Sequence, residues 1–124
     1  MKIDYNKKEY DREVRRFKEL TTKMYETFKK KRNDYGPSSR VTFEMFGPES
    51  MTVRMFDKLI RYSNLTSGDV KQLVKDESVK DTLLDLANYA LITILELEYI
   101  EAQNCVKSIV IGDVEYNVEE DDED

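Results

Sequence analysis

The chain has 124 residues, of which 37% are charged and 40% are hydrophobic, and its formal net charge at pH 7 is −6. This length fits a single domain with a modest hydrophobic core, and the low content of Gly and Pro favours helices. Because an acidic chain repels the nucleic-acid backbone, we do not expect binding to nucleic acid. A basic cluster at residues 29–32 falls at the predicted end of a helix, where it complements the helix dipole.

The composition excludes several types of site. The absence of histidine excludes Ser-His and Cys-His catalysis and histidine-ligated metals. Cys105 is the only cysteine, so the chain cannot form an internal disulfide or a cysteine zinc cluster. The glycines are isolated from one another, so any phosphate binding must use side chains or a metal ion. The sequence has neither a signal peptide nor an apolar run long enough to span a membrane, and we expect a cytoplasmic protein.

The first predicted helix covers about residues 11–32, because apolar residues recur there at helical spacing. We expect its core face to consist of Val14, Phe17, Leu20, Met24 and Phe28. The opposite face is charged and should be solvated, with Glu-to-Lys pairs among Glu19, Lys23, Glu26 and Lys30. Gly36 is suited to a left-handed helix stop, and Pro37 follows it. Residues 40–49 are expected to form a loop or a short irregular helix.

The next predicted helix begins near Glu49 and ends at Leu65, and it has two distinct faces. One face is polar and mostly cationic: Arg54, Asp57, Lys58, Arg61 and Asn64. The other face is apolar: Val53, Phe56, Leu59 and Ile60. Two interpretations of the cationic face are open. It either forms ion pairs on the helix surface, each of which stabilises little, or it binds phosphate groups.

The last predicted helix runs from Ser78 to about Asn104 and carries a narrow acidic stripe within an otherwise apolar sequence. The stripe consists of Asp81, Asp85 and Asn88, at positions that share one side of a helix. Because leucines border it on both sides, we expect the stripe at the edge of an interior, where carboxylates need a cation or a hydrogen-bond partner. The alternative is that the stripe is simply the solvent side of a core helix.

The sequence after this helix differs in character. Two short β-like runs flank Gly112 and predict a small hairpin within residues 106–118. Residues 119–124 are all acidic and predict a disordered tail. The expected organisation is therefore a helical domain at 1–105, a hairpin at 106–118 and a tail at 119–124.

Three segments carry a resemblance to a known family: KRNDYG at 31–36, RMFDKLIRYSNL at 54–65 and DESVKDTLLDLANYA at 76–90. In this order they resemble the nucleotide-modification-associated domain family, which consists of small, mostly bacteriophage proteins often described as MazG-like. The resemblance implies an all-α, MazG-like bundle of three to four helices, related to the MazG and dimeric-dUTPase nucleoside triphosphate pyrophosphohydrolases. Those enzymes hold Mg²⁺ between helices with Glu/Asp pairs and cleave a nucleotide between its α and β phosphates. A phage origin would place the protein in the host cytoplasm.

The resemblance also implies site residues. The Glu-x-x-Asp metal motif of the wider superfamily falls on residues 85–88, where Asn88 replaces an acid, and no paired Glu-x-x-Glu is evident on an earlier helix. Asp81 and Asp85 would be catalytic. The implied Mg²⁺ ligands are Glu77, Asp81, Asp85, Asn88 and Asp57. By their residue types, the candidate nucleotide-binding residues are Arg54, Lys58, Arg61, Asn64, Tyr35 and Tyr89, with Phe43 as a further aromatic residue that could stack on a base. The alternative for these aromatic residues is a place in the core.

The expected function is that of a Mg²⁺-dependent nucleoside triphosphate pyrophosphohydrolase in phage nucleotide metabolism. The alternative is a non-catalytic nucleotide-binding protein, which sequesters a signalling nucleotide or assists a DNA-modification system. The loss of an acid at Asn88 favours this alternative. A third possibility is a structural interaction protein without a nucleotide pocket. We expect a homo-oligomer in each case, because the apolar borders at Leu84, Leu91 and Leu95 need more cover than one chain supplies.

Overall fold

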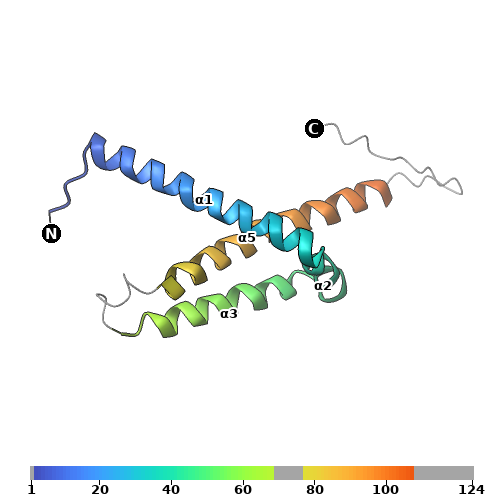
Figure 1. Cartoon of the computed structure of the whole chain (residues 1–124). Helices are drawn as coiled ribbons and strands as arrows, with labels where there is room; N and C mark the ends of the chain where they lie inside the picture. The colour runs from blue at the N-terminus through green and yellow to red at the C-terminus, as the bar shows by residue number, and fades with distance from the viewer. Residues whose placement is uncertain (1, 69–76, 108–124) are drawn as a thin grey trace, which may run out of the picture.

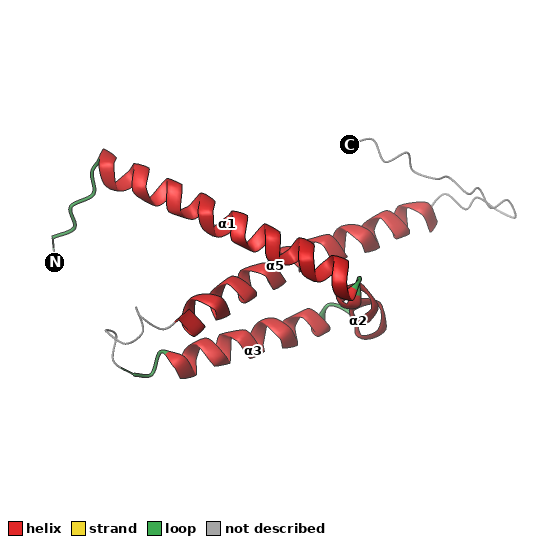
Figure 2. Cartoon of the chain, in the orientation of Figure 1, coloured by secondary structure: helices red, strands yellow, loops and turns green. Residues whose placement is uncertain are grey.

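A computed structural model describes residues 2–68 and 77–107 of the chain. This part contains four α-helices and no strand: α1 (Lys7–Tyr35), α2 (Ser38–Phe46), α3 (Glu49–Leu65) and α5 (Glu77–Lys107). The predicted all-α class is therefore confirmed for the described residues (Figure 2). Of the predicted hairpin at 106–118, the first two residues belong to α5, and the remainder lies outside the described residues, as does the predicted tail at 119–124.

The helix α5 is the centre of the arrangement. The helices α3 and α5 lie side by side and antiparallel, and α1 crosses α5 (Figure 1). The short helix α2 lies at the end of this pair, where it contacts both α3 and α5. The first half of α1 extends beyond the other helices, so its side chains are exposed (Figure 1). None of the described helices combines the length and the apolar character that a membrane span requires.

Two glycines with positive φ angles separate the first three helices. Gly36 has a φ of 68° and ends α1, with its amide donating to the Arg32 carbonyl at 3.0 Å. Gly47 has a φ of 76° and ends α2, with its amide donating to the Phe43 carbonyl at 2.7 Å. Glycine adopts this backbone region without a steric penalty. The predicted stop at Gly36 is confirmed, whereas the segment 40–49 forms most of a regular helix, α2, rather than a loop.

The hydrophobic core is thin. The apolar side chains that are buried within the described residues are Phe43, Met51 and Val79. The predicted core face of α1 is wrong for the first half of the helix, because Val14 is 51% and Phe17 is 70% exposed. Helical periodicity identifies an apolar face, but it does not show how far along the helix a packing partner extends.

The polar face of α3 points inward at Arg54 and Lys58, whereas Asp57, Arg61 and Asn64 of the same face are exposed. Arg54 and Lys58 are half-buried on the side toward the other helices, whereas the apolar face of α3 is 45–59% exposed. This exposed face consists of Val53, Phe56, Leu59 and Ile60. The helix α5 behaves in the same way, because Asp85 and Asn88 are half-buried while Leu83 and Ile94, on the opposite side, are exposed. The expectation that the acidic stripe lies at the edge of an interior is confirmed for Asp85 and Asn88 and is wrong for Asp81, whose side chain is 61% exposed.

Candidate functional site

Ion pairs and hydrogen bonds join the acidic stripe of α5 to cations of its neighbours. The Lys58 ammonium of α3 lies 3.2 Å from the Asp85 carboxylate, and the Lys23 ammonium of α1 lies 3.7 Å from the Asp81 carboxylate. Arg61 of α3 donates to the Thr82 hydroxyl at 3.1 Å. Carboxylates at the edge of an interior require such partners. The two polar stripes predicted from the sequence therefore meet at Lys58 and Asp85, and Asp81 pairs with α1 instead.

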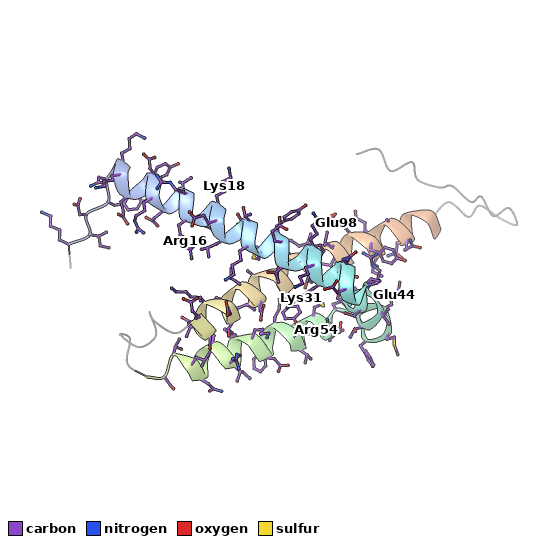
Figure 3. The ribbon with its side chains drawn as sticks, viewed as in Figure 1. Arg16, Lys18, Lys31, Glu44, Arg54 and Glu98 are labelled. Carbon is purple, nitrogen blue, oxygen red and sulfur yellow. The ribbon has the colours of Figure 1, made fainter. Side chains whose placement is uncertain are left out.

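A cavity of about 180 Å³ lies where α1, α2, α3 and α5 meet. Three cationic side chains and one carboxylate line it: Lys31, Arg32, Arg54 and Asp85. Figure 3 shows the labelled Lys31 of α1 and Arg54 of α3 close together in the view, and both line the cavity. The other lining residues are Phe28, Gly36, Ser38, Ser39, Asn88, Tyr89 and Ile92. We call this space the cationic cavity, because its lining carries more positive than negative charge.

Arg32 and Ser39, which line the cationic cavity, are hydrogen-bonded to a buried carboxylate. Glu96 of α5 is 1% exposed, and it accepts hydrogen bonds from Arg32 at 3.0 Å and from Arg40 at 3.2 Å. The Ser39 hydroxyl lies between these groups, since it accepts from Arg32 at 3.0 Å and donates to Glu96 at 3.4 Å. The Arg40 guanidinium also lies 4.1 Å from the centre of the Tyr99 ring. This network joins α1, α2 and α5 and holds Arg32 at the cavity wall.

Glu96 and its partners were not among the site residues predicted from the sequence. A signal was present, because Glu96 is the single charged residue within the run from Leu86 to Leu97. Charged residues are almost never fully buried unless they are paired, so a lone carboxylate in an apolar helix predicts a cationic partner elsewhere. The sequence does not show which of 20 Lys and Arg residues that partner is.

A second space, of about 260 Å³, lies between α1 and α5. Its lining contains Asp81, Asp85 and Asn88 together with Lys23, and we call it the polar hollow. Mg²⁺ in nucleotide sites is commonly held by one or two carboxylates, with water and phosphate as the other ligands. The polar hollow contains two carboxylates and an amide, which are ligand types that Mg²⁺ accepts, and both carboxylates are paired with lysines. Within residues 2–68 and 77–107, no group of three or more acidic side chains is placed to hold a metal.

The predicted site residues fall into two groups. Arg54, Asp85, Asn88 and Tyr89 line the cationic cavity, Asp81 lines the adjoining polar hollow, and Lys58 contacts Asp85. The second group lies outside both spaces: Arg61, Asn64, Asp57 and Glu77, all with exposed side chains. Glu77 lies 3.9 Å from Lys80, one turn further along α5. Tyr35 ends α1, but its side chain is outside the described part of the structure.

Phe43 is not available to a ligand. It is 5% exposed and forms part of the core, so it cannot stack on a base. Tyr89 is half-buried in the lining of the cationic cavity.

One known family matches the chain. No curated protein and no solved structure matches the chain. Residues 31–97 match the family described as nucleotide modification associated domain 1, and this range is more than half of the chain. The match includes all lining residues of the cationic cavity except Phe28, and it includes Glu96 with both of its arginine partners. The chain therefore belongs to the nucleotide modification associated domain 1 family.

Proposed function

We propose that this protein binds the phosphate groups of a nucleotide in the cationic cavity. The observation that carries the proposal is the convergence of Lys31, Arg32 and Arg54, from two helices, on one space of about 180 Å³. Its single lining carboxylate, Asp85, is already paired with Lys58. Arginine side chains bind phosphate through paired N–H groups, and lysine adds a point charge.

The partners of these cations distinguish the proposal from surface ion pairing. Within the described residues, Lys31 and Arg54 have no carboxylate partner, and Arg54 donates only to the neutral Thr42 hydroxyl, at 3.1 Å. Lys31 is exposed and needs no partner, whereas Arg54 is half-buried. A half-buried arginine without an anionic partner favours an external anion. The name of the family supports a nucleotide as the source of that anion.

Metal-dependent hydrolysis is the second candidate function. It is supported by the polar hollow, which shares Asp85 and Asn88 with the cationic cavity. Asp81 and Asp85 would hold Mg²⁺ there, and the bound ion would supply an activated water and offset charge on the phosphates. Both carboxylates are paired with lysines, Lys23 and Lys58, which would have to release them. Binding without turnover is therefore the function that the geometry supports best.

We also propose the relationships, the source and the location that the sequence led us to expect. They include a relation to MazG-like pyrophosphohydrolases, a bacteriophage source and a location in the host cytoplasm. A protein that binds nucleotides without turnover would act by sequestering a signalling nucleotide or by assisting a DNA-modification system.

A panel of ribo- and deoxyribonucleoside triphosphates tests the proposed function. We expect at least one of them to raise the melting temperature of the protein, because a ligand at 100 times its Kd stabilises the folded state by about 2.7 kcal/mol. Pyrophosphate release with Mg²⁺ should be measured in the same samples. If the protein also hydrolyses the nucleotide, Asp85→Asn should abolish turnover while the thermal shift remains.

The outcomes separate the candidates. A thermal shift without pyrophosphate release supports a binding protein, whereas release that survives Asp85→Asn would remove the carboxylate assignment. A panel without any shift or turnover would leave the interaction-protein hypothesis as the better one.

We also propose that the protein is a homo-oligomer. The apolar face of α3 is exposed along its length, and Phe46 of α2, which is 66% exposed, lines a shallow hollow together with Val53 of this face. Contiguous apolar surface of this kind is typical of an interface. We infer that this face packs against the same face of a second copy of the chain, since a two-fold interface uses the same patch on both subunits.

Substitution of Phe56, in the middle of this face, should dissociate the oligomer. We expect the native protein to have a mass in light scattering of at least twice 14.7 kDa, and Phe56→Asp to shift it to the mass of one chain. Asn64→Asp is the matched control, because it adds the same charge to the polar side of the same helix. A native protein that is already monomeric, or an unchanged mass for Phe56→Asp, would contradict the proposal.

A further inference from the structure

An apolar groove of about 370 Å³ lies between α1 and α5, directly beside the cationic cavity. Its walls are formed by Met24, Tyr25 and Phe28 of α1 and by Leu91, Ile92 and Leu95 of α5. The single amide in its lining is Asn88. The groove and the cationic cavity are continuous, because Phe28, Asn88 and Ile92 line both. A ligand that fills the cavity therefore has the groove as its apolar neighbour.

Asn88 occupies the junction of the spaces described so far. It lines the cationic cavity, the polar hollow and the apolar groove. Each space offers a different chemistry: positive charge, carboxylate oxygens and an apolar wall with an aromatic ring. A nucleotide has matching parts, since its phosphates are anionic and its base has apolar faces with a polar edge. The groove is the part of this arrangement that is not explained by phosphate binding.

We propose that the apolar groove holds the nucleobase, with the Tyr25 ring as stacking surface and the Asn88 amide on the edge of the base. This inference rests on the proposed binding of phosphate in the cationic cavity. Tyr25 is suited to stacking because its side chain belongs to the lining and is 59% exposed. Phe28 serves as the wall between the two spaces, since the Arg32 guanidinium lies 5.3 Å from the centre of its ring.

The chemistry of Asn88 distinguishes base recognition from a metal-only role. Its amide offers both donors and an acceptor, whereas a carboxylate at this position would only accept. The Asn88 nitrogen donates to the Met24 carbonyl at 3.4 Å, which is long for a hydrogen bond. Little is therefore lost when a base edge replaces this contact. In this proposal the Asn88 amide selects the base through hydrogen bonds that a carboxylate could not donate.

Calorimetric titration of the full chain tests the inference with inorganic tripolyphosphate and with nucleoside triphosphates. We expect the preferred nucleotide to bind at least about tenfold more tightly than tripolyphosphate, which is within the range for stacking of one base on an aromatic ring. Tyr25→Ala should bring the nucleotide close to the affinity of tripolyphosphate, and leave tripolyphosphate binding unchanged. Tyr25→Phe should retain the preference. Asn88→Asp should change the order of preference among the bases.

The control is Tyr10→Ala, on the same helix and outside the spaces described above, where Tyr10 is 54% exposed. It should leave both affinities unchanged. Failure of tripolyphosphate and nucleotides alike to bind would overturn the proposed function and this inference together. Tripolyphosphate binding without any gain from the nucleoside would overturn this inference alone. A lower oligomer mass for Tyr25→Ala, with unchanged nucleotide preference, would assign the groove to a second copy and also overturn it.

Discussion

Replacing Glu96 by Gln should lower the free energy of unfolding by about 2–3 kcal/mol. The substitution preserves the size of the side chain but leaves Arg32 and Arg40 without their common carboxylate. This loss is somewhat smaller than the usual cost of breaking a buried ion pair, because the side chains of Arg32 and Arg40 remain 25% and 34% exposed and are partly solvated. Urea unfolding followed by circular dichroism measures the change.

Glu98 provides the matched control, since it is an exposed glutamate two residues further along α5 (Figure 3). We expect Glu98→Gln to change the stability by less than about 0.5 kcal/mol, as is usual for surface substitutions. Equal effects of the two substitutions would show that the Glu96 network does not hold the three helices together. A second consequence of Glu96→Gln is weaker phosphate binding, because Arg32 loses the partner that positions it at the cavity wall.

Replacing Arg54 by Ala should raise the Kd for the preferred nucleotide by about 30- to 100-fold, which corresponds to about 2–3 kcal/mol. Arg54 lines the cationic cavity and its only hydrogen bond in the described structure is to the Thr42 hydroxyl, so the fold loses little. Arg54→Lys should give an intermediate Kd, because lysine keeps the charge but not the paired N–H groups. Calorimetric titration at two salt concentrations checks both the size of the effect and its electrostatic origin.

Arg61→Ala tests whether Arg61 binds phosphate, as the sequence predicted, or lies outside the phosphate site, as the structure indicates. The sequence analysis placed Arg61 on the same phosphate-binding face as Arg54, whereas the structure places it outside the cationic cavity, bonded to Thr82. We expect Arg61→Ala to leave the Kd within about twofold of the native value, which is the scale of a weak surface contact. An Arg61→Ala effect as large as that of Arg54→Ala would show that phosphate binds further along α3 than we propose.

The helices themselves could be predicted from the sequence because their signals are local. The start of α3 and the stop at Gly36 follow from residues within a few positions of each boundary. The composition of each helix face was also correct, since it depends only on helical periodicity. The helix α2 was underestimated, because its nine residues are too few to show a clear period and they lie between two proline-containing turns.

The direction in which each face points could not be predicted in this way. Apolar faces normally turn inward, yet Lys58 of α3 faces Asp85 of α5 while Phe56 and Ile94 are exposed. The sequence of one chain does not show whether an apolar face is covered by the same chain or by another copy. The exposed apolar faces are consistent with the proposed oligomer, in which the charged interior would form the site.

The sequence by itself determined three of the four described helices, α1, α3 and α5, together with the separation of cations on α3 from carboxylates on α5. It also gave a candidate set that contains Arg54, Asp85 and Asn88. Only the tertiary structure decided that Lys31 and Arg32 join Arg54 around one cavity, and that Glu96 holds Arg32 in place. The physical reason is distance along the chain. Arg32 and Glu96 are 64 residues apart, and no local periodicity records a contact of that separation.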